Sequence, residues 1–100
     1  MVIYEVNLDV DSALFPGYRT WLDEHVRAMI ALPGFIGAQV FERCDPPPPE
    51  NRRSFCVHYK LTSKADLDVY LRDHAERMRA DGAERFAGRF SASRRVLVED

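Results

Sequence analysis

One stretch of the sequence decides the fold: Val2-Ile3-Tyr4-Glu5-Val6-Asn7-Leu8-Asp9-Val10. Apolar residues occupy its even positions, and polar or charged residues occupy the odd positions from 5 to 9. A period of two is typical of a strand with one face against a core and the other face outside. The pattern therefore predicts that Tyr4 points inward beneath helices, whereas Glu5 points to the opposite face of a sheet.

The segments that follow this strand predict a helix and two further strands. Residues 18–32 place apolar side chains three and four positions apart, as an amphipathic helix does, and Pro33-Gly34 ends that helix. Alternation over residues 35–43 and 55–61 predicts two strands, although Gly37 weakens the first. The successive prolines within residues 45–51 exclude both helix and strand, so we expect a stiff, exposed connection there.

The last third of the chain predicts one long helix and a closing strand. Ser63 and Asp66 have the spacing of a capping box, which predicts that the helix begins at about Lys64. Its apolar stripe continues to Met78, and we expect the helix to end at Gly82, followed by one short turn over residues 83–88. Residues 90–99 predict a strand whose core face carries Phe90, Ala92, Val96 and Val98.

A faint internal repeat relates the two predicted helices. Trp21-Leu22-Asp23-Glu24-His25 with Met29 corresponds to Tyr70-Leu71-Arg72-Asp73-His74 with Met78. Two βαβ halves related in this way predict a single domain over residues 1–100 with an α+β, ferredoxin-like βαββαβ fold. Its four-stranded antiparallel sheet has the strand order 4-1-3-2, with two helices on one face. No glycine-rich phosphate loop follows a strand, which argues against a nucleotide-binding parallel sheet.

The composition is that of one compact domain. Hydrophobic residues make up 46% of the chain, and 14 Lys and Arg against 16 Asp and Glu give a net charge of −2. This balance argues against a strong, sequence-independent grip on nucleic acid. Two cysteines are too few for a disulfide scaffold, and the first ten residues lack the apolar run of a signal peptide or membrane span. We therefore expect a cytoplasmic protein that contacts no membrane.

RNA-recognition modules share this fold and need separate consideration. Such modules stack bases on aromatic rings of the open sheet face. Here Tyr4 lies two residues from Val6, and Phe55 lies two residues from Val57, so each ring shares a strand face with an apolar residue of the core. Both rings are therefore expected in the core. We expect no nucleic-acid partner.

The sheet face opposite the helices is predicted to be mixed in character. Glu5 is expected between Arg95 on one neighbouring strand and His58 or Lys60 on the other. Apolar side chains are scattered among these charges, at Ile3, Phe41 and Leu97. A small ferredoxin-like domain leaves this face bare unless something covers it, so we predict a homodimer formed through it.

His25 and His74 are the candidate catalytic residues. Each lies on the apolar stripe of its helix at the equivalent place in the repeat, and an imidazole can act as acid or base near neutral pH. The alternative is two structural histidines, each satisfied by one hydrogen bond. Three histidines and two cysteines show no pair at ligand spacing on one element, so we expect no metal site. Nothing in the sequence indicates a cofactor.

Arginines are concentrated between residues 77 and 95. Such a cluster suits a phosphate or carboxylate, although the acidic excess of residues 1–25 could also neutralise it across the pairing of the first and last strands. Any pocket is expected between the helices and the sheet, with an arginine such as Arg79 or Arg95 holding an acidic group. The other residues expected to line it are Tyr4, Trp21, His25, Tyr70 and His74.

Several segments together resemble a family of small bacterial proteins that is classed as a domain of unknown function within the dimeric α/β-barrel superfamily. These segments are Ile3-Tyr4-Glu5-Val6-Asn7, Leu32-Pro33-Gly34-Phe35, Tyr70-Leu71 with His74-Ala75 and Met78-Arg79, and Phe86 through Phe90 to Arg94-Arg95-Val96-Leu97. The resemblance spans nearly the whole chain. It implies a ferredoxin-like protomer and a sheet-to-sheet dimer, and it brings no established activity.

Three functions remain open from the sequence. The first is a homodimer that binds a small, anionic or aromatic metabolite between helices and sheet. The second is a cofactor-independent monooxygenase or isomerase that acts on a small aromatic or lactone substrate through His25 or His74. The third is a structural or partner-binding dimer, which gains weight if the space under the helices holds no more than a few water molecules.

Overall fold

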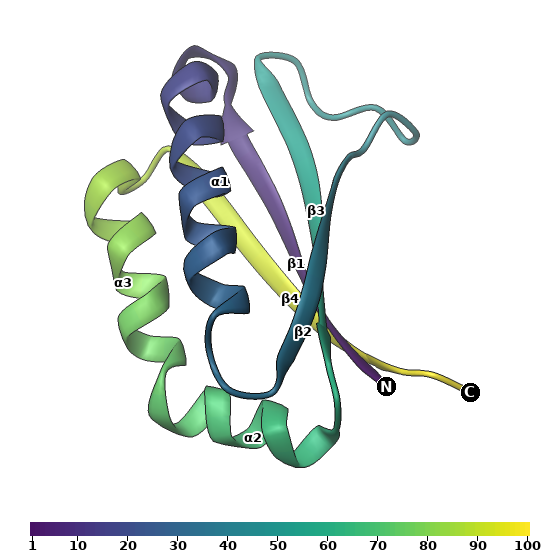
Figure 1. Ribbon diagram of the computed structural model, residues 1–100. Coiled ribbons are helices and arrows are strands. Elements are labelled where there is room, and N and C mark those ends of the chain that lie inside the picture. The colour runs from purple at the N-terminus through teal and green to yellow at the C-terminus, as the bar shows by residue number, and fades with distance from the viewer.

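The computed structural model describes residues 1–100 and has helices on one face of a four-stranded antiparallel sheet (Figure 1). The strands are β1 (Val2–Asp11), β2 (Phe35–Glu42), β3 (Arg52–Leu61) and β4 (Phe90–Val98), in the order β2-β3-β1-β4. The predicted α+β ferredoxin-like fold and its strand order are therefore confirmed. None of the helices combines the length and the apolar character needed to cross a membrane.

The alternation of β1 places its side chains as predicted. Tyr4 is buried beneath the helices, together with Val6 and Val10. Glu5 lies opposite His58 of β3 on one side and Arg95 of β4 on the other, on the face away from the helices. Unlike an ordinary outward-facing glutamate, Glu5 is only 4% exposed, because its neighbours cover it within a single chain.

The first helix begins earlier than the apolar spacing predicted. A 3₁₀ turn, η1 (Ser12–Leu14), precedes α1 (Phe15–Ile30). The Asp11 carboxylate accepts a hydrogen bond from the Ala13 backbone at 3.0 Å and so caps the turn. Pro16 is accommodated because the first turn of a helix needs no backbone donor.

The prediction of one helix from Lys64 to Gly82 is wrong in one respect. The chain forms two helices, α2 (Lys64–Asp73) and α3 (Ala75–Phe86), and the backbone of His74 between them is not helical. α2 crosses the lower end of the molecule and α3 lies alongside α1 (Figure 1). This turn lets Tyr70 of α2 pack against Tyr4 and Phe35 of the sheet while Met78 of α3 lies beside Trp21 of α1, and no proline or glycine marks the turn in the sequence.

Gly82 does not end a helix but lies inside α3, against the ring of Trp21. A Cβ at this position would stand 2.8 Å from the Trp21 Cη2 atom, so only glycine allows α3 to approach α1 this closely. The closing strand also departs from the expectation, since Val96 and Val98 are 42% and 69% exposed. They lie on an edge strand toward its end, beyond the cover of the helices.

Candidate functional site

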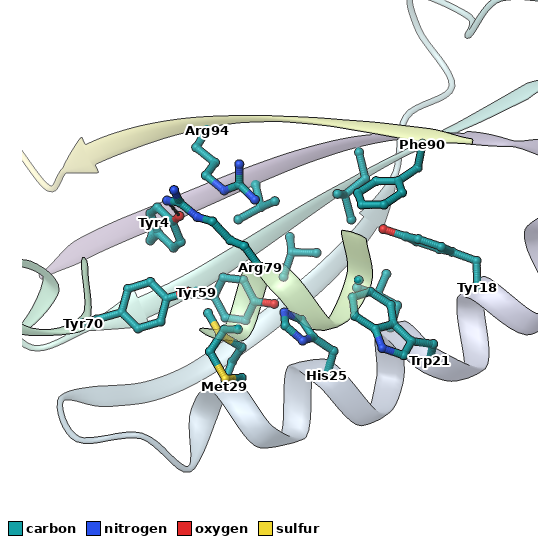
Figure 2. A pocket seen from close by; sticks show the side chains of 16 residues that line it. Tyr4, Tyr18, Trp21, His25, Met29, Tyr59, Tyr70, Arg79, Phe90 and Arg94 are labelled. Carbon is teal, nitrogen blue, oxygen red and sulfur yellow. Dashed lines mark hydrogen bonds between the residues drawn. The ribbon is translucent and has the colours of Figure 1, made fainter. Parts of the chain in front are cut away.

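A small cavity lies between the helices and the inner face of the sheet (Figure 2). Its volume is about 50 Å³, which is room for only a few water molecules. This is the condition under which the structural or partner-binding alternative gains weight, so a ligand of any size needs the cavity to open. Its walls are mainly aromatic and apolar, and they come from α1, α3 and all strands except β2, with one side chain from α2. The aromatic residues among them are Tyr4, Tyr18, Trp21, Tyr59, Tyr70 and Phe90.

Two arginines line this cavity on the side of β4. Arg79 of α3 donates a hydrogen bond from Nη2 to the Tyr4 hydroxyl at 2.8 Å, and Arg94 of β4 extends over the cavity nearby (Figure 2). Neither guanidinium forms an ion pair with a carboxylate of the chain. Two unpaired positive charges beside an apolar space are suited to a carboxylate or another small anion.

Tyr18 also lines the cavity and has an unsatisfied hydroxyl. The residue is 1% exposed, and its Oη is buried without any hydrogen-bond partner. Burial raises the pKa of Tyr18, so the hydroxyl is protonated and can donate a hydrogen bond. A buried hydroxyl without a partner costs free energy, and one that points into a cavity is suited to a polar group of a ligand.

Three side chains form the wall between the cavity and a groove on the surface. The groove, about 280 Å³, runs between α1 and α3, and Trp21, His25 and Met78 line both spaces. The Trp21 Nε1 donates to the Asp81 carboxylate of α3 at 2.8 Å, and the His25 ring stacks on the indole at 4.6 Å between centroids. Side chains of α1 and α3 thus separate the groove from the cavity, and an outward movement of α3 would join the two spaces.

His25 is partly buried in this wall, and its burial lowers the pKa of the imidazole. The negative charge of Asp81 raises this pKa and the positive charge of Arg94 lowers it, so the direction set by burial remains. The unfolded chain therefore takes up a proton at a higher pH than the folded chain does. Stability is then lost as the pH falls from about 6.5 toward the pKa of the folded state. Glu24, Arg77 and Arg85 also border this wall from the groove.

We predict that His25→Phe reduces the loss of thermal stability between about pH 7 and pH 5. Phenylalanine keeps the stacking on Trp21 but cannot take up the proton. Thermal unfolding followed by circular dichroism at several pH values measures how the unfolding temperature changes with pH. The matched variant His74→Gln, outside the wall, should keep the wild-type pH dependence; an equal reduction in both variants would contradict the assignment to His25.

The structure brings together five of the predicted site residues and places two elsewhere. The five that line the cavity are Tyr4, Trp21, His25, Tyr70 and Arg79. His74 lies at the junction of α2 and α3, where its Nδ1 accepts from Arg77 Nη2 at 2.8 Å, and it does not reach the cavity. Arg95 lies on the opposite face of the sheet, 2.5 Å from Glu5. The repeat therefore does not produce a pair of facing histidines.

Sequence reasoning missed two of the polar groups in the cavity. Arg94, next to the predicted Arg95, is the strand residue that shares a face with Tyr4. The alternation of residues in β4 indicates in the sequence that Arg94, not Arg95, faces the core. The spacing identifies Tyr18 only as a member of the helix stripe, and nothing in the sequence shows that its hydroxyl has no partner.

The outer face of the sheet carries a second polar cluster around Glu5. Hydrogen bonds from Arg95, Asn7 and His58 hold the pKa of Glu5 down at about 2, with Arg95 as the largest cause. The arginines near the C-terminus thus divide into two groups. Arg95 and Arg89 pair with acidic residues of β1, as one of the two sequence-based alternatives expected, whereas Arg79 and Arg94 do not.

Comparison with known proteins identifies a family and a fold. A family model described as "Domain of unknown function (DUF4286)" matches residues 1–99. No curated protein matches the sequence significantly.

Solved structures share the fold at low sequence identity. A Deinococcus radiodurans protein assigned as an antibiotic biosynthesis monooxygenase has a TM-score of 0.68 and 15% identity, covering 100% of this chain and 95% of that one. The haem degrader MhuD from Mycobacterium tuberculosis, solved with two haems in its active site, has a TM-score of 0.63 and 19% identity, covering 100% of this chain and 98% of that one. SnoaB, a cofactor-independent oxygenase from Streptomyces nogalater, has a TM-score of 0.60 and 12% identity, covering 99% of this chain and 93% of that one. At such identities the similarity shows the fold alone.

Proposed function

The chain belongs to the DUF4286 family, a domain of unknown function, and from this premise we propose that it binds a small aromatic carboxylate between its helices and its sheet. The observation that carries the proposal is the pair of unpaired guanidinium groups, Arg79 and Arg94, beside a cavity walled by aromatic rings. The buried hydroxyl of Tyr18 supplies a site for a second polar group. A single ring with a carboxylate at one end and a hydroxyl at the other matches this arrangement.

The size of the cavity requires that binding opens it. An apolar cavity of about 150 Å³ accommodates benzene, whereas the closed cavity measures only about 50 Å³. Displacement of α3 would add the groove of about 280 Å³ that lies beyond Trp21 and Met78. Such a movement must break the hydrogen bond between Trp21 and Asp81 and separate the indole from Gly82 and Phe86 of α3.

Trp21 gives the experiment that tests this function, because it is the only tryptophan of the chain and lines the cavity. We predict that titration with 4-hydroxybenzoate changes its fluorescence saturably, whereas the uncharged 4-hydroxybenzamide binds at least roughly tenfold more weakly. Tyr18→Phe should weaken binding of 4-hydroxybenzoate and leave binding of benzoate unchanged. No saturable change in the wild type, or equal affinity for acid and amide, would remove the proposal and favour a purely structural or partner-binding dimer.

The outer face of the sheet supports the second part of the proposal, a homodimer. Phe41 is 45% exposed there and packs on His58, and all helices lie on the other face. A stable interface buries roughly 800 Å² on each partner, and this sheet face is the large surface that no helix covers.

We predict that Phe41→Asp converts a dimer into a monomer without unfolding it. In the proposed dimer, a charge at the exposed Phe41 site would be covered by the second copy and desolvated without a partner. Light scattering at about 50 μM protein measures the mass. Val69→Asp places the same charge on an exposed site of α2 and should leave the dimer intact; a monomeric wild type at this concentration would overturn the assignment.

His25 favours a second candidate function, a cofactor-independent monooxygenase or isomerase. Its imidazole borders the cavity with a lowered pKa, so it is neutral and can accept a proton from a bound phenol or lactone. Under this alternative, His25→Ala still binds 4-hydroxybenzoate but abolishes any oxygen uptake or proton exchange that the wild type supports. His74→Ala should retain the activity, and its loss in both variants would count against this role for His25.

A further inference from the structure

Three side chains that transition metals favour meet on the outer face of the sheet, away from the cavity. Glu5 of β1 lies directly opposite His58 of β3. Cys56 comes two residues before His58, so its side chain emerges on the same face. A carboxylate oxygen, a ring nitrogen and the Cys56 Sγ all lie within 4.8 Å of one another.

This cluster borders a hollow in the outer face. The hollow measures about 650 Å³, and Glu5 and Cys56 are among its walls, together with Asn7 and Arg95. An ion held by the cluster would therefore keep one coordination position toward open space. Two neighbouring strands fix the three backbone positions, which is a more rigid base for ligands than a loop.

The two oxygens of Glu5 have separate roles in this arrangement. Its Oε2 accepts hydrogen bonds from Asn7 Nδ2 at 2.9 Å and Arg95 Nε at 2.5 Å. Its Oε1 faces His58 Nε2 at 2.9 Å. A metal can thus replace the proton between Oε1 and His58 while Asn7 and Arg95 continue to orient the carboxylate, as the hydrogen-bonding neighbours of metal ligands do.

The three ligand atoms are close enough to share one ion after their side chains rotate. Bonds of about 2.0 to 2.3 Å to oxygen, nitrogen and one sulfur place the ligand atoms of tetrahedral zinc about 3.3 to 3.5 Å apart. Glu5 Oε1 and His58 Nε2, now 2.9 Å apart, must separate slightly, and all three ligand atoms already lie within 4.8 Å of one another. A thiolate and an imidazole in the ligand set favour zinc and similar transition metals over magnesium or calcium.

We propose that Glu5, Cys56 and His58 form a binding site for a zinc-type dication, with the fourth position open to the hollow. On binding, the Cys56 thiol releases its proton to solvent. The carboxylate and the thiolate supply two negative charges against the two positive charges of the ion. The remaining positive charge is that of Arg95, whose side chain is 66% exposed to solvent. The site is separate from the cavity, so its test is independent of ligand binding there, but it lies on the same sheet face as the proposed dimer contact at Phe41.

The proposal departs from the sequence-based expectation that no metal ligands lie at suitable spacing. That expectation considers residues on one element only. Cys56 and His58 do share one face of β3, and the third ligand comes from the neighbouring strand. Only the strand register identifies Glu5 as that ligand.

Titration of the reduced full-length protein with Co²⁺ tests the site. We expect a thiolate-to-cobalt charge-transfer band that saturates at one equivalent per chain and disappears on addition of Zn²⁺. Cys56→Ser should abolish the band, and His58→Ala and Glu5→Gln should each weaken binding roughly tenfold or more. The chain offers matched controls, because Cys44→Ser, His25→Ala and His74→Ala change the same residue types elsewhere and should leave the band unchanged.

Each contrary outcome overturns the proposal. Wild-type protein without a charge-transfer band in excess Co²⁺ has no such site. A band that Cys44→Ser abolishes and Cys56→Ser retains belongs to the other cysteine. A band that needs Cys56 but is insensitive to both His58→Ala and Glu5→Gln reflects a thiol that binds metal without this cluster. Circular dichroism of each variant establishes that it is folded. If Cys56→Ser unfolds, the test is the affinity of His58→Ala for Co²⁺, and an unchanged affinity overturns the proposal.

Discussion

Replacement of both Arg79 and Arg94 by alanine is expected to lower the affinity for 4-hydroxybenzoate about 100-fold or more. A hydrogen bond to a charged group contributes about 1.5–3 kcal/mol, and the double variant removes two such donors from the ligand carboxylate. Each single variant should lose part of this affinity. Isothermal titration calorimetry measures the affinity of all three variants. The free energy of unfolding should change little in Arg94→Ala, because Arg94 is exposed and forms no ion pair, whereas Arg79→Ala also removes the hydrogen bond to the buried Tyr4 hydroxyl and should cost about 1–3 kcal/mol.

The matched control for this prediction removes two other positive charges. Arg27 and Arg72 are exposed and do not line the cavity, so Arg27→Ala with Arg72→Ala lowers the net charge equally. We expect this variant to bind like the wild type. If both double variants lose the same affinity, general electrostatic attraction explains binding, and the assignment of the carboxylate to Arg79 and Arg94 fails.

Gly34→Ala is expected to have the largest effect on stability, about 2–5 kcal/mol. Gly34 connects α1 to β2 with a φ of +87°, and a Cβ there would stand 2.5 Å from the Cβ of Asp66 near the start of α2. The substitution therefore combines a left-handed backbone with a collision that the first turn of α2 must relieve. Urea denaturation measures the change in the free energy of unfolding.

Gly88→Ala separates the two causes. Gly88 also has a positive φ, +76°, but a Cβ added there would have no neighbouring atom within 4 Å and would meet open space. We expect this variant to lose only about 1–2 kcal/mol, the cost of the left-handed backbone. Equal losses in Gly34→Ala and Gly88→Ala would show that the contact with Asp66 contributes nothing.

The sheet could be predicted because its information is local and repeated. The alternation in β1 assigns Tyr4 to the core and Glu5 to the outer face, and antiparallel pairing then determines the neighbours of Glu5. The same alternation assigns Arg94, not Arg95, to the side of Tyr4. The expectation that Arg95 could serve the pocket failed because it followed charge rather than the period of the strand.

The remaining features depend on contacts between distant segments. The turn at His74 is determined by what α2 and α3 bury, and the spacing of apolar residues is similar for one helix or two. Gly82 resembles a helix end in sequence, yet its role is close contact with Trp21, far earlier in the chain. The unsatisfied hydroxyl of Tyr18 is a property of three-dimensional packing that no pattern in the sequence reports.

The central claim is that a ligand enters the space between α1, α3 and the sheet, and a crystal structure of the complex with 4-hydroxybenzoate tests it most directly. The account predicts the ring among Tyr4, Tyr18 and Trp21, with its carboxylate within hydrogen-bond distance of Arg79 and Arg94 and with α3 displaced from Trp21. A ligand bound instead in the hollow beside Glu5, or on the surface of a molecule whose helices remain closed, would contradict it.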